Sequence, residues 1–215
     1  MTVRTSDAAR ALALTARRLW EAGLIAGADG NMSVRLGPDR VLVTPRGLLK
    51  SELTPADMVE VALDGRRRRG FRHASSELDL HLRVYRQRPS CGAVVHAHPP
   101  TAIGFAVAGI PLDTDVLAET VILLGPVPIV RYAQTGTPAL GDLVEPLVKD
   151  HHGVLLANHG AVTWGPDLAM ARIRMESLEH AARILLTARQ LGRVRRLTRR
   201  QVAALELLRE GNRDG

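Results

Sequence analysis

The feature that most constrains this chain is a short apolar run that ends in two histidines and two prolines, Val94-Val95-His96-Ala97-His98-Pro99-Pro100. Its valines favour a strand, and side chains alternate along a strand, so His96 and His98 project from one face and can reach one point. The prolines cannot continue a central strand, so this point is expected at a sheet end, where open α/β sheets carry their sites. Neutral imidazole is a common ligand of zinc and similar divalent metals. The spacing alone fits a metal site and a pair of histidines bonded to the backbone equally well.

Two further residues make a metal site the stronger interpretation. Glu77 opens an expected helix, and His159 follows an expected buried strand at 154–157. Positions on such different elements can converge only at one edge of a sheet, and three imidazoles with a carboxylate suit zinc or a similar metal better than calcium or magnesium. His81 lies four residues after Glu77 and could share its helix face, so the spacing leaves His81 open as a ligand. The other histidines are predicted to lie at the surface: His73, His151, His152 and His180.

Three stretches are suited to bind an anion. Gly30-Asn31 enters an alternating strand, and Pro45-Arg46-Gly47 makes a second tight turn with an arginine at its tip. Glycine turns of this kind can present backbone N–H groups to an anion. Ser75 and Ser76 are natural N-caps of the helix that Glu77 opens, and the N–H groups and dipole of a helix N-terminus also attract anions. An ordinary turn without a ligand is the alternative at Gly30-Asn31.

Composition narrows the class of protein. A length of 215 residues with 46% hydrophobic content is enough for one core, so residues 1–215 are expected to form a single domain. The formal charge of +7 comes mainly from arginine, since Lys50 and Lys149 are the only lysines, and with 3% aromatic residues it does not indicate a nucleic-acid partner. The single cysteine, Cys91, excludes an internal disulfide. No stretch approaches the roughly 20 apolar residues of a membrane span, so we expect a soluble cytoplasmic protein.

Helical and strand patterns alternate along the chain. A helix is expected from the Ser6-Asp7 cap to Gly27, and further helices over 77–88, 100–108, 138–149, 167–191 and 198–209. Strands are expected over 31–36, 40–44, 59–63, 92–98, 127–130, 154–157 and 161–164. The pattern of 116–124 fits a strand or a helix, and the arginine-rich stretches 66–69 and 193–200 are predicted to be solvated loops.

Five stretches of the chain, taken together, match a known family. In order and spacing this chain resembles the class II aldolase/adducin family, and within it the L-fuculose-1-phosphate aldolases most closely. The resemblance covers nearly the whole chain and is specific only as a set. The matching stretches are Gly30-Asn31-Met32-Ser33-Val34-Arg35, Ser75-Ser76-Glu77, Val94-Val95-His96-Ala97-His98, Tyr132-Ala133-Gln134-Thr135-Gly136-Thr137 and Asn158-His159-Gly160.

The resemblance implies an α/β fold: a three-layer α/β/α sandwich around a mixed, mostly antiparallel sheet. It also implies a homotetramer with sites at subunit interfaces. Zinc, or manganese or cobalt with the same ligands, would be held by Glu77, His96, His98 and His159, and His81 would not be a ligand. A substrate phosphate would be cradled by Gly30, Asn31, Gly47, Ser75 and Ser76, in agreement with the independent interpretation of these stretches as anion sites.

The activity implied is the reversible cleavage of a ketose 1-phosphate, such as L-fuculose 1-phosphate or a related deoxyketose phosphate. The products would be dihydroxyacetone phosphate and an aldehyde, formed through a metal-stabilised enediolate. Glu77 would move the proton at the carbon next to the carbonyl. The related ribulose-phosphate 4-epimerases carry aspartate at this position, so Glu77 favours an aldolase.

Two departures from the family pattern keep alternatives open. Arg46 replaces a threonine of the fuculose enzymes, and its planar fork can pair with phosphate or with carboxylate. Asp115 stands where those enzymes carry a proton-donating tyrosine, so the residue that exchanges a proton with the aldehyde oxygen is unassigned. A metal-dependent decarboxylase of a hydroxy or aromatic acid is therefore the second hypothesis. A non-catalytic, adducin-like module is the third, and the four convergent ligands argue against it.

Overall fold

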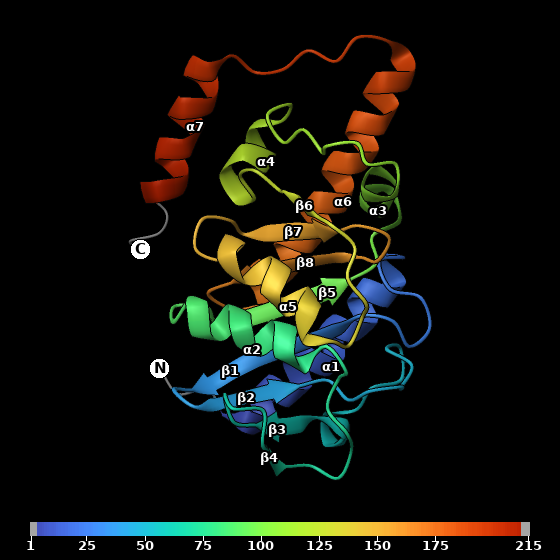
Figure 1. Cartoon of the computed structure of the whole chain (residues 1–215), viewed down its shortest axis with the longest axis vertical. Coiled ribbons are helices and arrows are strands. Elements are labelled where there is room, and N and C mark those ends of the chain that lie inside the picture. Colours follow the sequence, from blue (N-terminus) through green and yellow to red (C-terminus); the bar gives the residue numbers. More distant parts are fainter. Residues whose placement is uncertain (1–3, 212–215) are drawn as a thin grey trace.

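A computed structural model describes residues 4–211, with side chains to Arg209, and shows a central eight-stranded sheet with helices on both faces (Figure 1). The strand order is β4-β3-β2-β1-β5-β8-β7-β6, and every neighbouring pair is antiparallel except β6 and β7. The expected mixed, mostly antiparallel sheet is thus confirmed. The strands are β1 (Asn31–Gly37), β2 (Arg40–Val43), β3 (Val59–Val61), β4 (Arg67–Arg69), β5 (Ala93–Ala97), β6 (Ile129–Val130), β7 (Gly153–Leu156) and β8 (Ala161–Gly165).

Helices cover the sheet because its strands are apolar on both faces. The helices are α1 (Thr5–Glu21), α2 (Leu78–Gln87), α3 (Pro100–Val107), α4 (Ala118–Leu123), α5 (Pro138–Val144), α6 (Leu168–Leu191) and α7 (Arg199–Gly211), with short 3₁₀ turns η1 (Pro55–Asp57) and η2 (Glu145–Leu147). No helix among the described residues is long and apolar enough to cross a membrane.

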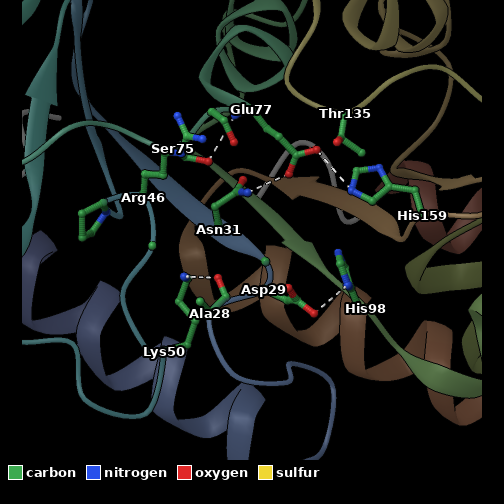
Figure 2. Close-up of a pocket in the computed structure, with 14 residues that line it drawn as sticks. Ala28, Asp29, Asn31, Arg46, Lys50, Ser75, Glu77, His98, Thr135 and His159 are labelled. Carbon is green, nitrogen blue, oxygen red and sulfur yellow. Dashed lines mark hydrogen bonds and ion pairs between the residues drawn. The ribbon is translucent and has the colours of Figure 1, made fainter.

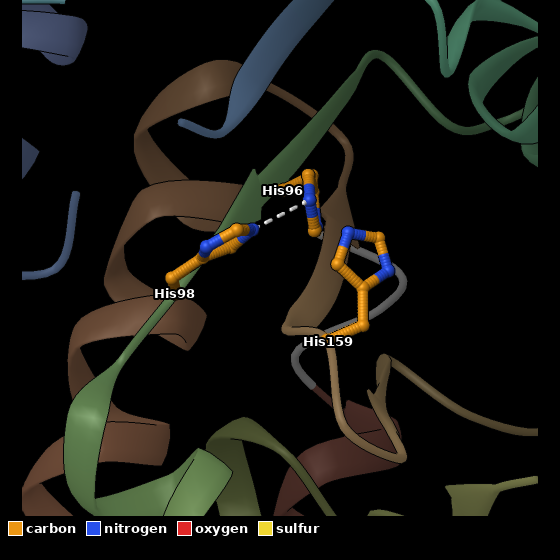
Figure 3. A group of neighbouring side chains, drawn as sticks. All are labelled: His96, His98 and His159. Atoms are coloured by element: carbon orange, nitrogen blue, oxygen red, sulfur yellow. Dashed lines mark hydrogen bonds between the residues drawn. The ribbon is translucent and has the colours of Figure 1, made fainter. Parts of the chain in front are cut away.

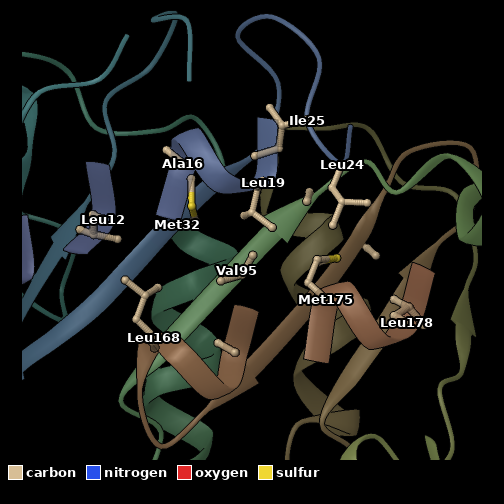
Figure 4. Close-up of a cluster of buried hydrophobic side chains, with 14 of the residues drawn as sticks. Leu12, Ala16, Leu19, Leu24, Ile25, Met32, Val95, Leu168, Met175 and Leu178 are labelled. Atoms are coloured by element: carbon tan, nitrogen blue, oxygen red, sulfur yellow. The ribbon is translucent and has the colours of Figure 1, made fainter. Parts of the chain in front are cut away.

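Strand β5 contributes to a separate apolar cluster on each face of the sheet. Val95 packs with Leu19 of α1 and Met175 of α6 (Figure 4). Val94 faces the other way, into a cluster that includes Tyr85 of α2 and Leu140 of α5. Because side chains alternate, His96 shares the face of Val94 and lies on the α2 side of the sheet. This alternation places His96 near the start of α2.

The prediction of a solvated loop over 66–69 is wrong for residues 67–69. They form the edge strand β4, with all three side chains exposed. The Asp64-Gly65 turn folds this stretch back onto β3. Arginines suit such an edge, because their long charged side chains extend into water and oppose pairing with another chain. The ambiguous stretch 116–124 contains the helix α4, and the helix expected over 138–149 is interrupted at η2, where Pro146 lacks a backbone N–H.

Two smaller predictions are also wrong. Neither Ser75 nor Ser76 is the N-cap of α2: Glu77 occupies the cap position, and Ser75 Oγ accepts the Glu77 N–H at 3.2 Å. His152 is 3% exposed rather than a surface residue, because it leads directly into the buried strand β7. Among the other histidines expected at the surface, His73 and His180 are exposed, and His151 is partly buried.

Candidate metal centre

Three histidines from two adjacent parts of the sheet converge on one point (Figure 3). His96 is the fourth residue of β5, His98 follows the end of that strand, and His159 lies in the turn between β7 and β8. The Nε2 atoms of His96 and His98 are 3.2 Å apart, and one ring nitrogen from each of the three lies within 4.8 Å of the others. The i, i+2 spacing and the strand end thus bring together the predicted imidazoles.

The backbone of the neighbouring strand orients His96. Its Nδ1 donates to the carbonyl oxygen of Ala161 on β8 at 3.0 Å, so Nδ1 carries a proton and Nε2 is turned toward the other two rings. The turn that carries His159 needs unusual backbone: Asn158 has φ of 55°, a conformation that asparagine tolerates better than most residues. At Gly160 an added Cβ would lie 2.7 Å from His96 Cε1 and 2.8 Å from His98 Cδ2. Glycine is therefore required for the approach of this turn to the two histidines.

Glu77 completes the centre from the opposite side. Its Oε2 is 3.0 Å from His96 Nε2, and its Oε1 is 3.2 Å from His159 Nε2. Asn31 Nδ2 donates a hydrogen bond of 2.9 Å to Glu77 Oε2. Burial opposes ionisation of Glu77, but the charge and hydrogen bond of His96, with further help from His159 and Asn31, hold the pKa of this carboxyl far below its usual range. Glu77 is therefore a carboxylate anion at neutral pH.

The donor set fits a divalent cation. Three imidazole nitrogens and one carboxylate face a common point, and this is the set that borderline metals such as zinc prefer. Two buried polar atoms of this group, Glu77 Oε1 and His159 Nδ1, make no hydrogen bond among the described residues. Buried polar atoms usually have a partner, and a cation between these side chains would satisfy the carboxylate oxygen.

His81 belongs to a different network, although its spacing from Glu77 left it open as a ligand. Its ring is fully buried, and Nδ1 lies 2.7 Å from Ser33 Oγ, which is in turn 2.8 Å from the Tyr85 hydroxyl. Burial lowers the pKa of His81 to about 3, so the ring stays neutral. The ring is held by this polar chain between α2 and β1.

The protonation of His96 predicts how metal binding depends on pH. Burial disfavours its charge, but Glu77 outweighs burial and raises the pKa of His96 above 6.5. Burial lowers the pKa of His98 and brings that of His159 to about 4. Protons therefore compete with metal mainly at His96, and we expect zinc affinity to fall about tenfold per pH unit below the pKa of His96. Chelator competition at pH 5.5, 6.5 and 7.5 measures this, and a flat affinity over that range would contradict it.

A cavity of about 280 Å³ adjoins the histidines (Figure 2). The two sets of predicted site residues meet in it. All six predicted phosphate residues line this cavity, namely Gly30, Asn31, Arg46, Gly47, Ser75 and Ser76, and so do Glu77, His98 and His159. Asp115 is not among its lining residues; its carboxylate instead faces Arg196, at 3.6 Å.

Backbone contacts hold together the stretches that are predicted to bind an anion. The Arg46 N–H donates to His73 O at 3.0 Å, and Pro45 forms a β-bridge with Ala74, so the Arg46-Gly47 turn lies beside the serines. Gly30 has φ of 70°, and a Cβ there would lie 2.8 Å from His96 O. Glycine at position 30 therefore permits both the turn and its approach to β5.

Sequence reasoning missed three polar residues of the cavity: Asp29, Lys50 and Thr135. Asp29 Oδ2 is 3.4 Å from His98 Nδ1, on the side of the ring away from His96. Thr135 lies in one of the stretches that match the family, so that stretch was a usable signal. The signal for Lys50 was its rarity in a chain with only two lysines.

Comparisons with known proteins agree with this geometry. The family model described as Class II Aldolase and Adducin N-terminal domain matches residues 10–186. A 5-deoxy-D-ribulose 1-phosphate aldolase of Bacillus thuringiensis is 34% identical over 178 residues, which are 82% of this chain and 83% of that protein. A 3-oxo-tetronate 4-phosphate decarboxylase of Pectobacterium atrosepticum is 33% identical over 193 residues, 86% of each chain. A solved L-fuculose 1-phosphate aldolase superposes with a TM-score of 0.88 at 29% identity, over 96% of both chains.

Proposed function

Since this chain belongs to the class II aldolase and adducin family, we propose that it is a metal-dependent aldehyde-lyase that reversibly cleaves a ketose 1-phosphate. Its products would be dihydroxyacetone phosphate and an aldehyde, and L-fuculose 1-phosphate or a related deoxyketose phosphate would be the substrate. One observation supports this most strongly. The six residues predicted to bind phosphate line the same cavity as Glu77, His98 and His159, and His96 lies next to these three side chains. A scaffold protein has no need for that combination.

In this proposal Glu77, His96, His98 and His159 hold the metal, with zinc the first choice. When bound, the metal would supply Lewis-acid stabilisation of the negative charge that develops on the substrate carbonyl oxygen as the C3–C4 bond breaks. Glu77 is ionised and lies at the cavity wall, so it can act as a base. In the aldol direction it would take the proton from C3 of dihydroxyacetone phosphate, and the aldehyde oxygen would gain a proton from solvent. In the cleavage direction it would return the proton to C3, and the C4 hydroxyl would release its proton to solvent as the aldehyde forms.

The substrate phosphate would bind at the other end of the cavity. Gly30 and Gly47 lie in turns whose backbone N–H groups can face an anion, Asn31 begins β1 directly after the first turn, and Ser75 and Ser76 add hydroxyl donors. These two serines also lie just before α2, whose N-terminus favours negative charge. The distance between the two ends of one small cavity would then select a short phosphorylated sugar.

A decarboxylase of a phosphorylated keto acid is the second candidate. One relative of comparable similarity carries that activity, and Arg46 supplies this cavity with a cation that can bind a carboxylate as well as a phosphate. The contacts of the Arg46 turn favour phosphate, because its backbone is attached to the segment that carries the two serines.

A substrate panel separates these candidates. Zinc-loaded protein would be incubated with ketose 1-phosphates and with phosphorylated 3-keto acids, and dihydroxyacetone phosphate would be read by a coupled reductase while carbon dioxide is read separately. Release of dihydroxyacetone phosphate from a ketose 1-phosphate, without carbon dioxide, supports the aldolase, and its best substrate names the aldehyde. Decarboxylation of a 3-keto acid of this kind also leaves dihydroxyacetone phosphate, so release of carbon dioxide from a keto acid, with no dihydroxyacetone phosphate from any ketose 1-phosphate, would overturn the aldolase in favour of the decarboxylase. Bound zinc without either product would contradict both.

Arg46→Thr is expected to raise KM for the best phosphorylated substrate about tenfold, because a charge-assisted hydrogen bond contributes roughly 1.5–3 kcal/mol. Turnover at saturation should change little, since Arg46 lies in the turn that carries Gly47, away from the histidines. Steady-state kinetics measure both constants. Arg17→Thr, at an exposed position of α1, is the matched control. An unchanged KM in Arg46→Thr would remove Arg46 from the phosphate site.

We also propose that residues 1–215 act as one domain in a cytoplasmic homotetramer with sites at subunit interfaces. Large exposed apolar side chains support an interface, since Phe71 and Tyr132 are 70% and 62% exposed. The buried free Cys91 suits a reducing compartment. Light scattering coupled to gel filtration tests the tetramer, and a monomeric mass would contradict it.

A further inference from the structure

Lys50 is the buried charged residue of the cavity that the proposed mechanism does not use. It is 1% exposed, which is rare for lysine. Its ammonium donates hydrogen bonds to two backbone carbonyls, Ala28 O at 2.7 Å (Figure 2) and Leu48 O at 3.0 Å. Two of its three N–H donors are therefore used on the protein backbone.

These carbonyls belong to the two glycine turns of the cavity. Ala28 lies two residues before Gly30, and Leu48 directly follows Gly47. Both glycines have left-handed backbone, with φ of 70° and 76°. The Lys50 backbone N–H also donates to Gly27 O at 3.1 Å, so main chain and side chain attach Lys50 to the same turn. The lysine therefore connects two segments that are separated by the strands β1 and β2.

The tip of the Gly47 turn is exposed, since Arg46 and Gly47 face solvent and only the following Leu48 packs against the core. A Cβ built at Gly47 would meet no atom within 4 Å, whereas one at Gly30 would contact β5 and Ile25. The ammonium of Lys50 thus links a turn with an exposed tip to one that lies against the sheet. Without this link, the Gly47 turn would be held by its contacts with the 73–74 segment and by the packing of Leu48 against the core.

The charge of Lys50 strengthens these bonds. Burial lowers the pKa of Lys50 to about 8, against an opposing effect of Asp29, so the side chain is mostly an ammonium at neutral pH. Hydrogen bonds from a charged donor are shorter and stronger than those between neutral groups. The positive charge also lies at the wall of a cavity that we assign to an anion.

We propose that Lys50 is a positioning residue that fixes the spacing of the Gly30 and Gly47 turns, so that their backbone N–H groups face one anionic group of the substrate. The proposal rests on the proposed function only for the identity of that anion. The link between the turns belongs to the protein itself and can be measured without substrate.

Lys50→Met tests the link, since methionine has a similar length and no donor. We expect hydrogen exchange in peptides covering 26–32 and 44–50 to become about tenfold faster, while peptides of β5 and β8 stay unchanged. The dissociation constant of inorganic phosphate and the KM of the best panel substrate should rise by about the same factor, with kcat and zinc content retained. This magnitude follows from the roughly tenfold to hundredfold value of a hydrogen bond to a charged group.

Lys149→Met is the matched control, because Lys149 is the only other lysine and is exposed. Lys50→Gln, which keeps a shorter and uncharged amide donor, should give an intermediate effect and serves if methionine prevents folding. Exchange in both turns equal to wild type would overturn the proposal. So would faster exchange throughout the sheet, which would make Lys50 a general stability residue. If wild-type protein binds no phosphate, the assignment of the anion fails, and the exchange data still decide the role of Lys50.

Discussion

Glu77→Gln is expected to lower turnover by about a thousandfold or more, the loss that removal of a general acid–base group produces. Glutamine keeps the size of the side chain and an oxygen for Asn31, which donates to Glu77 Oε2 at 2.9 Å. It cannot take up a proton at neutral pH, and it removes the negative charge next to His96 and His159. Steady-state rates with the best panel substrate measure the loss.

Metal loss must be separated from loss of the base, because Glu77 is proposed for both roles. Turnover of Glu77→Gln would therefore be measured at saturating zinc, with bound zinc quantified by atomic emission. Glu52→Gln, at an exposed position, controls for the change of charge. A Glu77→Gln variant that regains wild-type turnover when zinc is saturating would show that Glu77 only holds the metal.

Gly160→Ala is expected to weaken zinc binding about a hundredfold although it removes no ligand, which is the upper end of the effects seen when groups that orient metal ligands are changed. The added Cβ would lie 2.7 Å from His96 Cε1, 2.8 Å from Ala97 O and 2.8 Å from His98 Cδ2. Because Ala97 O is backbone of the central sheet, the turn or the imidazoles must shift. Competition with a zinc chelator measures the affinity.

Gly104→Ala provides the control, because Gly104 lies in α3 and a Cβ there would meet no atom within 4 Å. That variant should bind zinc normally and gain slight stability, since alanine is favoured over glycine in a helix. Thermal melting of both variants separates a local change from unfolding. Wild-type zinc affinity in Gly160→Ala would show that the centre adjusts to the added methyl group at no cost.

The centre could be predicted from sequence because its geometry follows from local rules. Alternation along a strand placed His96 and His98 on one side, and the following prolines ended the strand at that point. Spacing could not decide about His81, because i, i+4 positions share a helix face and only the packing against Ser33 shows where its ring lies. The layers of the fold came from the family resemblance and not from periodicity.

What could not be predicted depends on contacts between distant segments. The position of Lys50 can be predicted only if it is known that the Gly30 and Gly47 turns meet. No local sequence pattern contains that information. The burial of His152 follows from the neighbours of β7 in the sheet. The edge strand β4 was missed because three consecutive arginines have no alternation, and only pairing with β3 makes them a strand.

The two ends of the cavity differ in how they can evolve. His96 lies on a strand that is paired on both sides, to β1 and β8, and packed on both faces. A substitution near His96 therefore disturbs the core and lowers the stability of the fold. Arg46 lies at the exposed tip of a turn, where the charge of its side chain can change at little cost to folding. Under the proposed function, a substitution at position 46 would change which phosphorylated substrate is preferred while the four proposed metal ligands stay the same, so a mutant library for new specificities should begin at this position.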